Sequence, residues 1–303
     1  MDFLALTGRP KDKFIQFALD FNKVKHPERL TFPRLASEKI DGVFCLAHRH
    51  EGDVTIYSRT GEVYTSMRHI EEALKDILED GEIVIFEACG PMGTPQPVVS
   101  GWCRDTKEQH PELMAGCHDY IYIKEFLHGG HVLYHRRHAI LKACVDNWRA
   151  FKATKATYWT LFCIAQKPVV SLDEAKAYAE EIWAGGGEGV VLRNPDAVYQ
   201  PGKRNDDIIK IKKGVSYDLE VVGLKEGKGK YKDTLGTLVC RWKDGKTIEI
   251  SGMTDEQRRW WWKYPHMIVG KVVQVDAMCE SSKGLLREPR FKGPRWDKEK
   301  GDF

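Results

Sequence analysis

The sequence predicts an α+β protein of two unequal domains, and three observations support this. The chain has 303 residues, which is about twice the length of a typical domain. Short β-like runs alternate with helix-like stretches over its first two thirds, as in mixed domains. Near residue 215 the pattern changes to short strands split by glycine-rich or charged turns. We therefore expect a mixed domain over residues 1–215 and a smaller, mostly β domain over residues 216–303.

The first domain opens with apolar residues at helical spacing between Lys11 and Phe21, and Pro27 ends that pattern. A short helix is expected there. Six apolar runs then predict strands: Val43 to Ala47, Val54 to Tyr57, Glu82 to Glu87, Tyr120 to Phe126, Gly189 to Arg193 and Ile208 to Ile211. Three stretches between them predict helices: Thr65 to Leu78, His131 to Trp148 and Leu172 to Trp183.

The second domain has a different pattern of predicted elements, with short strands and one helix. One helix is expected from Thr254 to Trp262. Short strands are predicted around it: Leu219 to Leu224, Gly236 to Trp242, Thr247 to Ser251 and Val272 to Met278. Four or five strands with one helix in 88 residues suit a small closed barrel such as an OB-fold, which often binds nucleic acid.

Composition narrows the class of protein. Hydrophobic residues make up 42% and charged residues 30% of the chain, which favours a folded core. No apolar run is long enough to span a membrane, and the segment Met1 to Pro10 lacks the layout of a signal peptide. A cytoplasmic protein without membrane contact is expected. The eight cysteines are never closer than 14 residues, so reduced thiols are expected rather than a CxxC metal or redox motif.

Positive charge is concentrated in the second domain. The whole chain carries +3, but residues 216–303 hold 18 Lys and Arg against 14 Asp and Glu. Two clusters account for this: Lys225, Lys228, Lys230 and Lys232, then Lys283, Arg287, Arg290, Lys292, Arg295, Lys298 and Lys300. Such clusters are typical of polyanion-binding surfaces, and a solvated basic face is the alternative.

Six short motifs follow one another along the chain. They begin with Lys39, Ile40, Asp41 and Gly42, directly before a predicted strand. The others are Ser58 to Gly61, Asp80 to Glu82, Glu188 to Arg193, Lys210 to Lys212, and Arg295 to Lys298. A single KxDG tetrapeptide is common by chance, but six motifs in order are specific.

This ordered set resembles the motifs of the covalent nucleotidyltransferases, most closely the ATP-dependent DNA ligases. The resemblance is to the minimal, two-domain ligases of bacteriophages or to small bacterial ligases. The resemblance runs from Ser37 to Lys298. It implies an ATP-grasp-like nucleotidyltransferase domain of antiparallel sheets and helices, followed by an OB-fold domain. It also implies ATP and Mg²⁺ or Mn²⁺ as cofactors, nicked double-stranded DNA as the partner, and a monomer.

The resemblance makes Lys39 the nucleophile that becomes covalently bonded to AMP. A lysine must be neutral to attack, so positive charge and a metal are expected beside it. Lys210 and Lys212 supply such charge, and alternation along a strand places both on the same face, with Ile211 on the other. By the resemblance these two lysines contact the phosphates. The nucleotide-binding segment around Lys39 also includes Ser37, Glu38 and Ile40.

Carboxylates and an aromatic residue complete the expected nucleotide site. Glu188 resembles the metal-binding carboxylate, and Mg²⁺ prefers carboxylate, water and phosphate oxygens. Glu82 resembles the residue that holds the ribose hydroxyls and is a second candidate metal ligand. Tyr122 is the expected adenine-stacking residue, although Tyr120 lies on the same strand face. Asp41 resembles the aspartate that assists the sealing step.

The remaining calls concern phosphates and DNA. Arg59 resembles the arginine that engages both the nucleotide and the 5′-phosphate of the nick, which suits a bidentate phosphate donor. Arg295 and Lys298 match the last motif, which orients the pyrophosphate leaving group by a hinge motion near Lys213 to Tyr217. Other expected DNA contacts are Lys203, Arg204, Lys228 and Lys230.

One position departs from the family. Ligases usually carry an arginine two residues after the glycine of the first motif, and this chain has Phe44 there. Arg49 or Arg59 is expected to compensate. Three other signals are discounted: a glycine-rich stretch from Gly223 to Lys228 that lacks the Ser or Thr of a P-loop, the helix-spaced histidines 131, 135 and 138, and the tryptophan row 260–262, expected to be partly buried.

Two other functions are compatible with the motifs. An mRNA-capping guanylyltransferase or an RNA ligase shares the lysine motif and the OB domain, so nucleotide choice discriminates between them. A non-catalytic nucleic-acid-binding protein with a decayed transferase domain is the third hypothesis. It predicts that Lys39→Ala leaves all activity unchanged.

Overall fold

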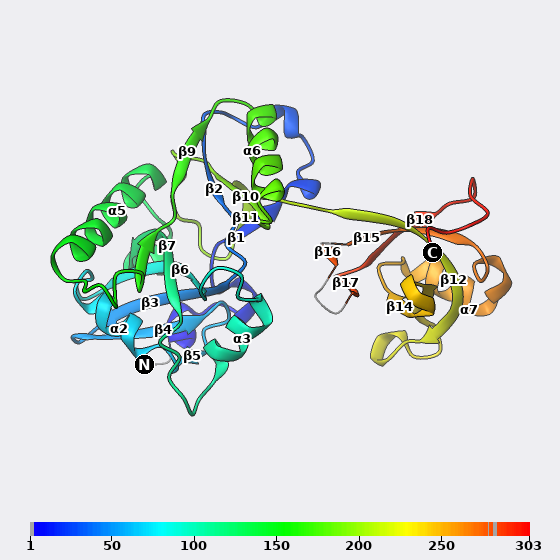
Figure 1. The fold of residues 1–303 in the computed structure, drawn as a ribbon, viewed down its shortest axis with the longest axis horizontal. Coiled ribbons are helices and arrows are strands. Elements are labelled where there is room, and N and C mark those ends of the chain that lie inside the picture. Colours follow the sequence, from blue (N-terminus) through cyan, green and yellow to red (C-terminus); the bar gives the residue numbers. More distant parts are fainter. Residues whose placement is uncertain (1–2, 278, 281–283) are drawn as a thin grey trace. The chain divides into compact units, whose positions relative to one another are not determined.

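The computed structural model describes residues 3–277, 279–280 and 284–303. The chain forms two compact units, Met1–Lys212 and Lys213–Phe303, and both are drawn in Figure 1. The predicted boundary lies three residues further along. Met278 of the last predicted strand and Lys283 of the basic cluster lie outside the described residues.

A six-stranded sheet forms the base of the first unit, in the order β5-β4-β3-β6-β7-β8. All of its neighbours are antiparallel except β7 and β8. Its strands are β3 (Val43–His50), β4 (Asp53–Ser58), β5 (Val63–Tyr64), β6 (Glu82–Cys89), β7 (Met114–Tyr122) and β8 (Leu161–Cys163).

Both faces of this sheet are buried. Strand alternation sends Val84 and Phe86 of β6 into one core, with the helices α2 (Arg68–Lys75), α3 (Gln96–Arg104) and α5 (Tyr134–Phe151). The same alternation sends Ile83 and Ile85 into a second core, which includes Phe3 of α1 (Phe3–Thr7) and Phe126 of α4 (Ile123–His128). Phe44 of β3 packs against this second core.

A five-stranded sheet completes the first unit, in the order β1-β11-β10-β2-β9. Its strands are β1 (Phe17–Asp20), β2 (Arg34–Glu38), β9 (Gln166–Val169), β10 (Gly189–Arg193) and β11 (Arg204–Lys212). Helix α6 (Leu172–Ala184) packs Ala175 and Ala179 against it. The helix begins where the Ser171 side chain accepts a hydrogen bond from the Glu174 N–H at 3.1 Å.

Two predicted elements of this unit are wrong in part. The expected helix from Lys11 to Phe21 is a 3₁₀ turn at Lys11–Lys13 followed by strand β1, because Phe17 pairs with β11 and this long-range pairing overrides the local spacing. The expected strand from Tyr120 to Phe126 ends at Tyr122, where α4 begins.

The second unit is a small β-structure with the strand order β14-β13-β12-β15-β18 and a separate β16-β17 pair. Its elements are β12 (Val215–Glu226), β13 (Leu235–Arg241), β14 (Thr247–Ile250), α7 (Asp255–Lys263), β15 (Val272–Ala277), β16 (Cys279–Glu280), β17 (Leu286–Arg287) and β18 (Arg290–Pro294). One core of its own includes Leu219, Trp242 and Trp261. The two units confirm the predicted α+β class, with a mostly β second part.

Three smaller expectations can be checked directly. Within the described residues, no helix combines the length and the apolarity needed to cross a membrane. The seven cysteines whose side chains the structure describes are free thiols. Of the tryptophan row, Trp261 is buried and Trp260 is exposed.

Candidate active site

A cavity of about 330 Å³ lies in the first unit, and both of its sheets contribute residues. Strands β2, β10 and β11 of the five-stranded sheet bring Ser37, Val191 and Lys210 to its wall. Strands β3, β6 and β7 of the six-stranded sheet bring Phe44, Glu87 and His118. The other lining residues are Ile15, Gln16, Phe17, Ala18, Glu38, Lys39, Ile40, Gly42, Arg59, Ile164, Arg193, Arg204, Ile208 and Lys212.

The register of three neighbouring strands brings Lys39, Glu188 and Lys212 together. Lys39 follows β2, and its N–H donates to the Gly189 carbonyl at 2.8 Å. Lys212 lies opposite Gly189 in the β10–β11 ladder. The Glu188 carboxylate then accepts from Lys39 Nζ at 2.5 Å on one oxygen and lies 3.0 Å from Lys212 Nζ on the other. Two lysines distant in sequence therefore share one carboxylate.

This carboxylate is charged. Burial by itself would raise the pKa of Glu188, but the positive charge and hydrogen bond of Lys39, followed by those of Lys212, lower the pKa below its ordinary value. The three side chains are 22%, 13% and 18% exposed in the order Lys39, Glu188, Lys212. Charge–charge interactions are stronger at such a mostly buried position than in bulk water, which suits a site that binds charged groups.

Lys210 lies two residues before Lys212 on β11 and lines the same cavity. Ile211 between them belongs to the hydrophobic core. Burial, and then the charge of Lys212, lowers the pKa of Lys210. The strand thus presents two lysines on one face, as the alternation of the sequence predicts.

Two glycines of the motifs permit this close packing. A Cβ on Gly189 would lie 2.0 Å from the Ile211 carbonyl oxygen, and its φ of +152° is one that other residues rarely adopt. A Cβ on Gly42 would lie 2.5 Å from the Ala88 carbonyl oxygen. No side chain fits at either position, so β10 approaches β11, and the segment before β3 approaches β6, more closely than other residues would allow.

Glu82 does not line this cavity, where the residue that holds the ribose or a metal was expected. It lies at the start of β6, where its carboxylate accepts hydrogen bonds from the Tyr120 hydroxyl and from the Glu79 N–H at 2.7 Å. β6 runs antiparallel to β3, so the end of β6 lies beside the first motif. Glu82 lies seven residues of strand, or roughly 23 Å, from that end.

Glu87 occupies the place that was assigned to Glu82. It lies directly opposite Phe44 in the β3–β6 ladder and lines the cavity. Burial, reinforced by the negative charge of Glu188, raises the pKa of Glu87 to about 7, against the opposing charges of Lys39, Arg59 and Arg193. The direction of the strands could have located Glu87 from the sequence. Because β6 runs antiparallel to β3, an acidic residue near the end of β6 lies beside the start of β3.

Tyr122 also lies outside the cavity lining, where the adenine-stacking residue was expected. It ends β7 with a side chain that is 48% exposed, while Tyr120 is buried against Glu82. His118 lines the cavity instead. In the ladder Ile85 pairs with Asp119 and Phe86 with Cys117, so His118 is the extra residue of a β-bulge, which redirects its side chain. Strict alternation from the sequence could not have placed it.

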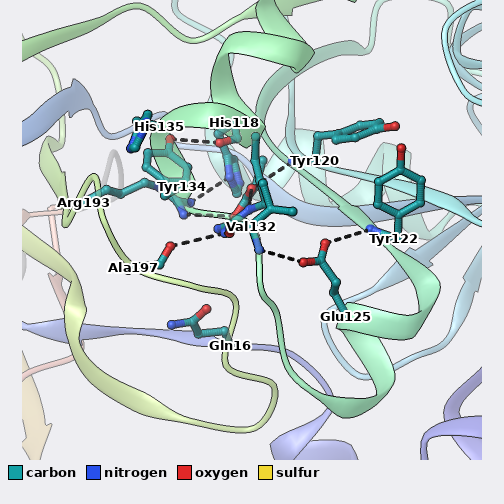
Figure 2. A network of polar contacts seen from close by, with 12 residues as sticks. Gln16, His118, Tyr120, Tyr122, Glu125, Val132, Tyr134, His135, Arg193 and Ala197 are labelled. Atoms are coloured by element: carbon teal, nitrogen blue, oxygen red, sulfur yellow. Dashed lines mark hydrogen bonds and ion pairs between the residues drawn. The ribbon is translucent and has the colours of Figure 1, made fainter.

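The His118 ring is held by its neighbours. Its Nδ1 lies 2.8 Å from Arg193 Nη2, and the Tyr134 hydroxyl donates to the His118 carbonyl oxygen at 3.0 Å; Figure 2 shows both contacts, with Tyr122 drawn apart from them. Burial and then the charge of Arg193 lower the pKa of His118 to about 3. The imidazole is therefore neutral at physiological pH, and because Nδ1 accepts from Arg193, its proton is on Nε2.

Arg193 is fixed from behind by a buried aspartate. Its guanidinium lies 3.5 Å from Asp119 Oδ2 and over the Tyr134 ring. Asp119 also accepts from Arg137 Nε at 2.8 Å. Burial would raise the pKa of Asp119, but Arg137 and Arg193 hold it below its ordinary value. This network holds the Arg193 guanidinium at the cavity wall.

The other predicted residues divide between the cavity and the surface. Arg59 and Arg204 line the cavity, and Lys203, Asp41 and the second-unit residues Lys228 and Lys230 are exposed. Phe44 lines the cavity where the family has an arginine. Of its two candidate replacements, Arg59 is present in the cavity, and Arg49 is not, because its guanidinium donates to the Lys75 and Leu78 carbonyl oxygens.

The last motif makes its contacts within the second unit. Arg295 and Lys298 both donate to Asp218. Of the three helix-spaced histidines, His135 contacts the Pro195 carbonyl at 2.9 Å and His138 contacts the Cys163 thiol at 3.4 Å. Over the part of the chain that the structure describes, no group of three or more His, Cys, Asp or Glu side chains is arranged to hold a metal ion.

Comparison with known proteins agrees with this geometry. The model of the ATP dependent DNA ligase domain matches residues 22–212, which is more than half of the chain. The chain belongs to the ATP-dependent DNA ligase family. The model of the DNA ligase OB-like domain matches residues 226–295 of this ligase-family chain.

Curated relatives include the DNA ligase of Halobacterium salinarum, 28% identical over 250 residues that cover 72% of this chain and 41% of the relative. The DNA ligase of Methanothrix thermoacetophila is 30% identical over 234 residues, covering 72% and 40%. The chain thus spans about two fifths of the length of these ligases.

Solved ligase structures share the fold. A structure described as a Lig E DNA ligase has a TM-score of 0.72 and 18% identity and covers 93% of this chain and 98% of its own. The ATP-dependent DNA ligase from bacteriophage T7, in complex with ATP, has a TM-score of 0.56 and 16% identity and covers 94% and 99%. At these identities the likeness establishes the fold alone.

Proposed function

We propose that this chain is an ATP-dependent DNA ligase that seals nicks between a 5′-phosphate and a 3′-hydroxyl in duplex DNA. The observation that carries the proposal is the contact of Lys39 with Glu188 and, through it, with Lys212, beside a cavity of nucleotide size. Membership of the ligase family supports it. We also propose that the enzyme is monomeric and cytoplasmic.

In the first step Lys39 Nζ attacks the α-phosphorus of ATP. A phosphorus–nitrogen bond forms, and the bond from the α-phosphorus to the bridging oxygen breaks, releasing pyrophosphate. The Glu188 carboxylate accepts a hydrogen bond from Nζ and so orients the nucleophile. Lys210 and Lys212 on the cavity wall offset negative charge that develops on the phosphates.

In the second step an oxygen of the DNA 5′-phosphate attacks the same phosphorus, the bond to Lys39 breaks, and a DNA-adenylate forms. In the third step the 3′-hydroxyl attacks the 5′-phosphorus, the new backbone bond forms, and AMP leaves. Arg59 is the guanidinium on the cavity wall that suits the 5′-phosphate. Asp41 is the carboxylate proposed to assist the third step.

The nucleoside is proposed to lie between the two sheets. Glu87 accepts from the ribose hydroxyls when it is ionised, and the neutral His118 ring stacks on adenine. These two residues replace Glu82 and Tyr122 of the sequence-based prediction. Ser37, Glu38 and Ile40 line the same space around Lys39.

One carboxylate of this site, that of Glu188, is suited to bind a divalent metal ion. Mg²⁺ is usually bound by one or two carboxylates together with substrate phosphates, and Mn²⁺ accepts the same ligands, so Glu188 is the residue that would hold either ion. When bound, the ion offsets phosphate charge. Lys39 and Lys212 contact Glu188, so these contacts would rearrange when nucleotide and metal bind.

Labelling of the protein tests the proposal. The protein is incubated with Mg²⁺ and either α-labelled or γ-labelled ATP, and label is expected only from the α position. Lys39→Ala should remain unlabelled, and Lys142→Ala, an exposed lysine on α5 paired with Asp146, should label normally. Intact mass identifies protein that was purified already adenylylated.

Three outcomes would contradict the proposal. Label from α-labelled GTP but not ATP would favour a capping guanylyltransferase. Sealing of nicked RNA but not nicked DNA by the labelled protein would favour an RNA ligase. Neither label nor an adenylylated mass, with unchanged DNA binding by Lys39→Ala, would favour the non-catalytic hypothesis.

A further inference from the structure

One buried carboxylate in the second unit binds both cations of the last motif. Arg295 Nη1 donates to Asp218 at 2.8 and 3.1 Å, and Lys298 Nζ donates to the same Asp218 oxygen that receives the shorter bond. Arg295 also donates to Asp297 at 2.8 and 2.9 Å. The positions of the two cations relative to each other are therefore set by Asp218.

Asp218 is buried by the motif and not by the hydrophobic core. Along β12 the core residues are Val215, Tyr217, Leu219 and Val221, so alternation points Asp218 to the opposite face. On that outer face a carboxylate would ordinarily be exposed, yet the side chain of Asp218 is only 9% exposed. Its cover includes Arg295 and Lys298, which remain 30% and 39% exposed themselves.

The segment Gly301 to Phe303 holds the backbone of Asp218. The Asp302 N–H donates to the Asp218 carbonyl at 2.7 Å, and the Asp218 N–H donates to the Asp302 carboxylate at 2.7 Å. Phe303 packs on Tyr217 with ring centroids 5.7 Å apart. A Cβ on Gly301 would meet the Glu220 nitrogen at 2.8 Å, so this segment lies tightly against β12. Both the side chain and the backbone of Asp218 are thus constrained.

We propose that Asp218 is a positioning residue of the last motif, which presents Arg295 and Lys298 as a pair of fixed separation to the pyrophosphate leaving group, and that Asp302 supports it. This rests on the proposed ligase function. Arg295 and Lys298 stay partly exposed while Asp218 holds them, so their N–H donors remain available to phosphate oxygens. Fixing them in advance removes the cost of ordering two long side chains when ATP binds.

The proposal predicts an effect confined to one step. Asp218→Asn keeps the shape of the side chain and removes its charge, and we expect self-adenylylation to slow about 10- to 100-fold, the size of effect that misplaced catalytic groups produce. Sealing of a synthetic nick that already carries a 5′-adenylate, measured without ATP, should stay within about twofold, because no pyrophosphate leaves in that step. Asp302→Ala should give a smaller effect of the same kind.

Three variants calibrate the measurement. Asp276→Asn, on β15 of the same unit and paired with the exposed Lys292, should change neither step. Arg295→Ala should slow self-adenylylation. In an Arg295→Ala background, Asp218→Asn should slow self-adenylylation by a smaller factor than in the wild type, because only the placement of Lys298 then remains to be lost.

Three results would contradict the positioning role of Asp218 or the proposed function of the last motif. If Asp218→Asn slows both steps in parallel, with a lowered melting temperature, Asp218 is only a structural ion-pair partner and the proposal fails. If Arg295→Ala slows self-adenylylation and Asp218→Asn does not, the positioning role alone is contradicted. If Arg295→Ala leaves self-adenylylation unchanged, the proposed function of the last motif is what fails.

Discussion

Lys39 Nζ lies 2.5 Å from Glu188 Oε2, although 149 positions separate the two residues in the sequence. The contact exists because β2 and β10 are neighbours with Glu38 opposite Val190, which places the residue after one strand beside the residue before the other. Glu188 also binds Lys212, so the proposed nucleophile and a second lysine of the cavity wall are connected through one carboxylate.

Glu188→Gln should reduce self-adenylylation about 100-fold or more, since it removes the charge that pairs two lysines and the only proposed metal ligand of the site. Single-turnover labelling measures this. Glu181→Gln, on the exposed side of α6 and paired with Lys167, is the matched control and should label at the wild-type rate. Wild-type labelling by Glu188→Gln would show that the contact with Lys39 has no role in the chemistry.

Glu87→Gln should raise the KM for ATP and remove its dependence on pH near neutrality. The raised pKa of Glu87, about 7, means that the wild-type carboxylate becomes an acceptor for ribose hydroxyls as the pH rises through that value, so the wild-type KM should fall over the same range. Self-adenylylation rates at several ATP concentrations and pH values measure this. Glu82→Gln should lower thermal stability and leave the KM unchanged; a raised KM there would restore the original assignment.

The same carboxyl group has a consequence for stability. A buried acid with a raised pKa keeps its proton in the folded state at pH values where the unfolded chain has lost it. Glu87 therefore favours folding most below its ordinary value of 4.5, and this contribution declines as the pH rises toward 7. Glu87→Gln should flatten that part of the wild-type dependence of melting temperature on pH.

His118→Ala should raise the KM for ATP about tenfold, because one base–ring stack contributes roughly 1–3 kcal/mol. His118→Phe should retain most of the affinity, since the imidazole acts as a neutral ring. Tyr122→Ala provides the comparison and should be unchanged. Equal effects of His118→Ala and Tyr122→Ala would remove the evidence for stacking by His118.

Gly189→Ala should abolish labelling and destabilise the first unit. Its Cβ would need the Ile211 carbonyl oxygen to move from 2.0 Å, which would separate β10 from β11 and Glu188 from Lys212. Gly101→Ala in α3, where a Cβ meets nothing within 4 Å, is the control and should be neutral or slightly stabilising. Thermal melting and labelling are measured together, and a fully active Gly189→Ala would contradict the close-approach argument.

Replacement of Lys228 and Lys230 by glutamine should weaken binding to nicked DNA and flatten its salt dependence, by about 0.9 in logarithmic slope for each lost phosphate contact. Self-adenylylation should be unaffected. Fluorescence anisotropy over a series of salt concentrations measures the slope. An unchanged slope would mean that these exposed lysines form a solvated face and not a DNA contact.

Much of the fold could be predicted from the sequence because strong patterns coincide with the elements that formed. Helix α6 begins one residue after its Ser171 cap and ends one residue beyond the prediction, and β10 matches its predicted bounds. The segment Phe17–Asp20 could not be predicted, because its pairing partner β11 lies nearly 190 residues away. Local spacing carries no information on such a partner.

The positions of Lys39, Glu188 and Lys212 could be predicted because each of these motif residues lies at the end of a predicted strand or directly next to it. The site was not predictable where the direction or regularity of a strand decides the place. Glu82 and Glu87 lie on the same strand, and only the antiparallel register selects Glu87. His118 was missed because a bulge changes the face on which it lies, and a bulge has no simple sequence signature.

The cavity wall is shared by two sheets that are otherwise held by separate hydrophobic cores. A nucleotide bonded to Lys39 on one sheet and in contact with Glu87 and His118 on the other, as proposed above, would crosslink the two sheets. Ligand binding to the folded state alone raises its stability, and a covalent ligand does so without dissociating. A preparation that contains both forms should therefore melt in two transitions, and adding pyrophosphate, which reverses the first step, should convert the upper transition into the lower one.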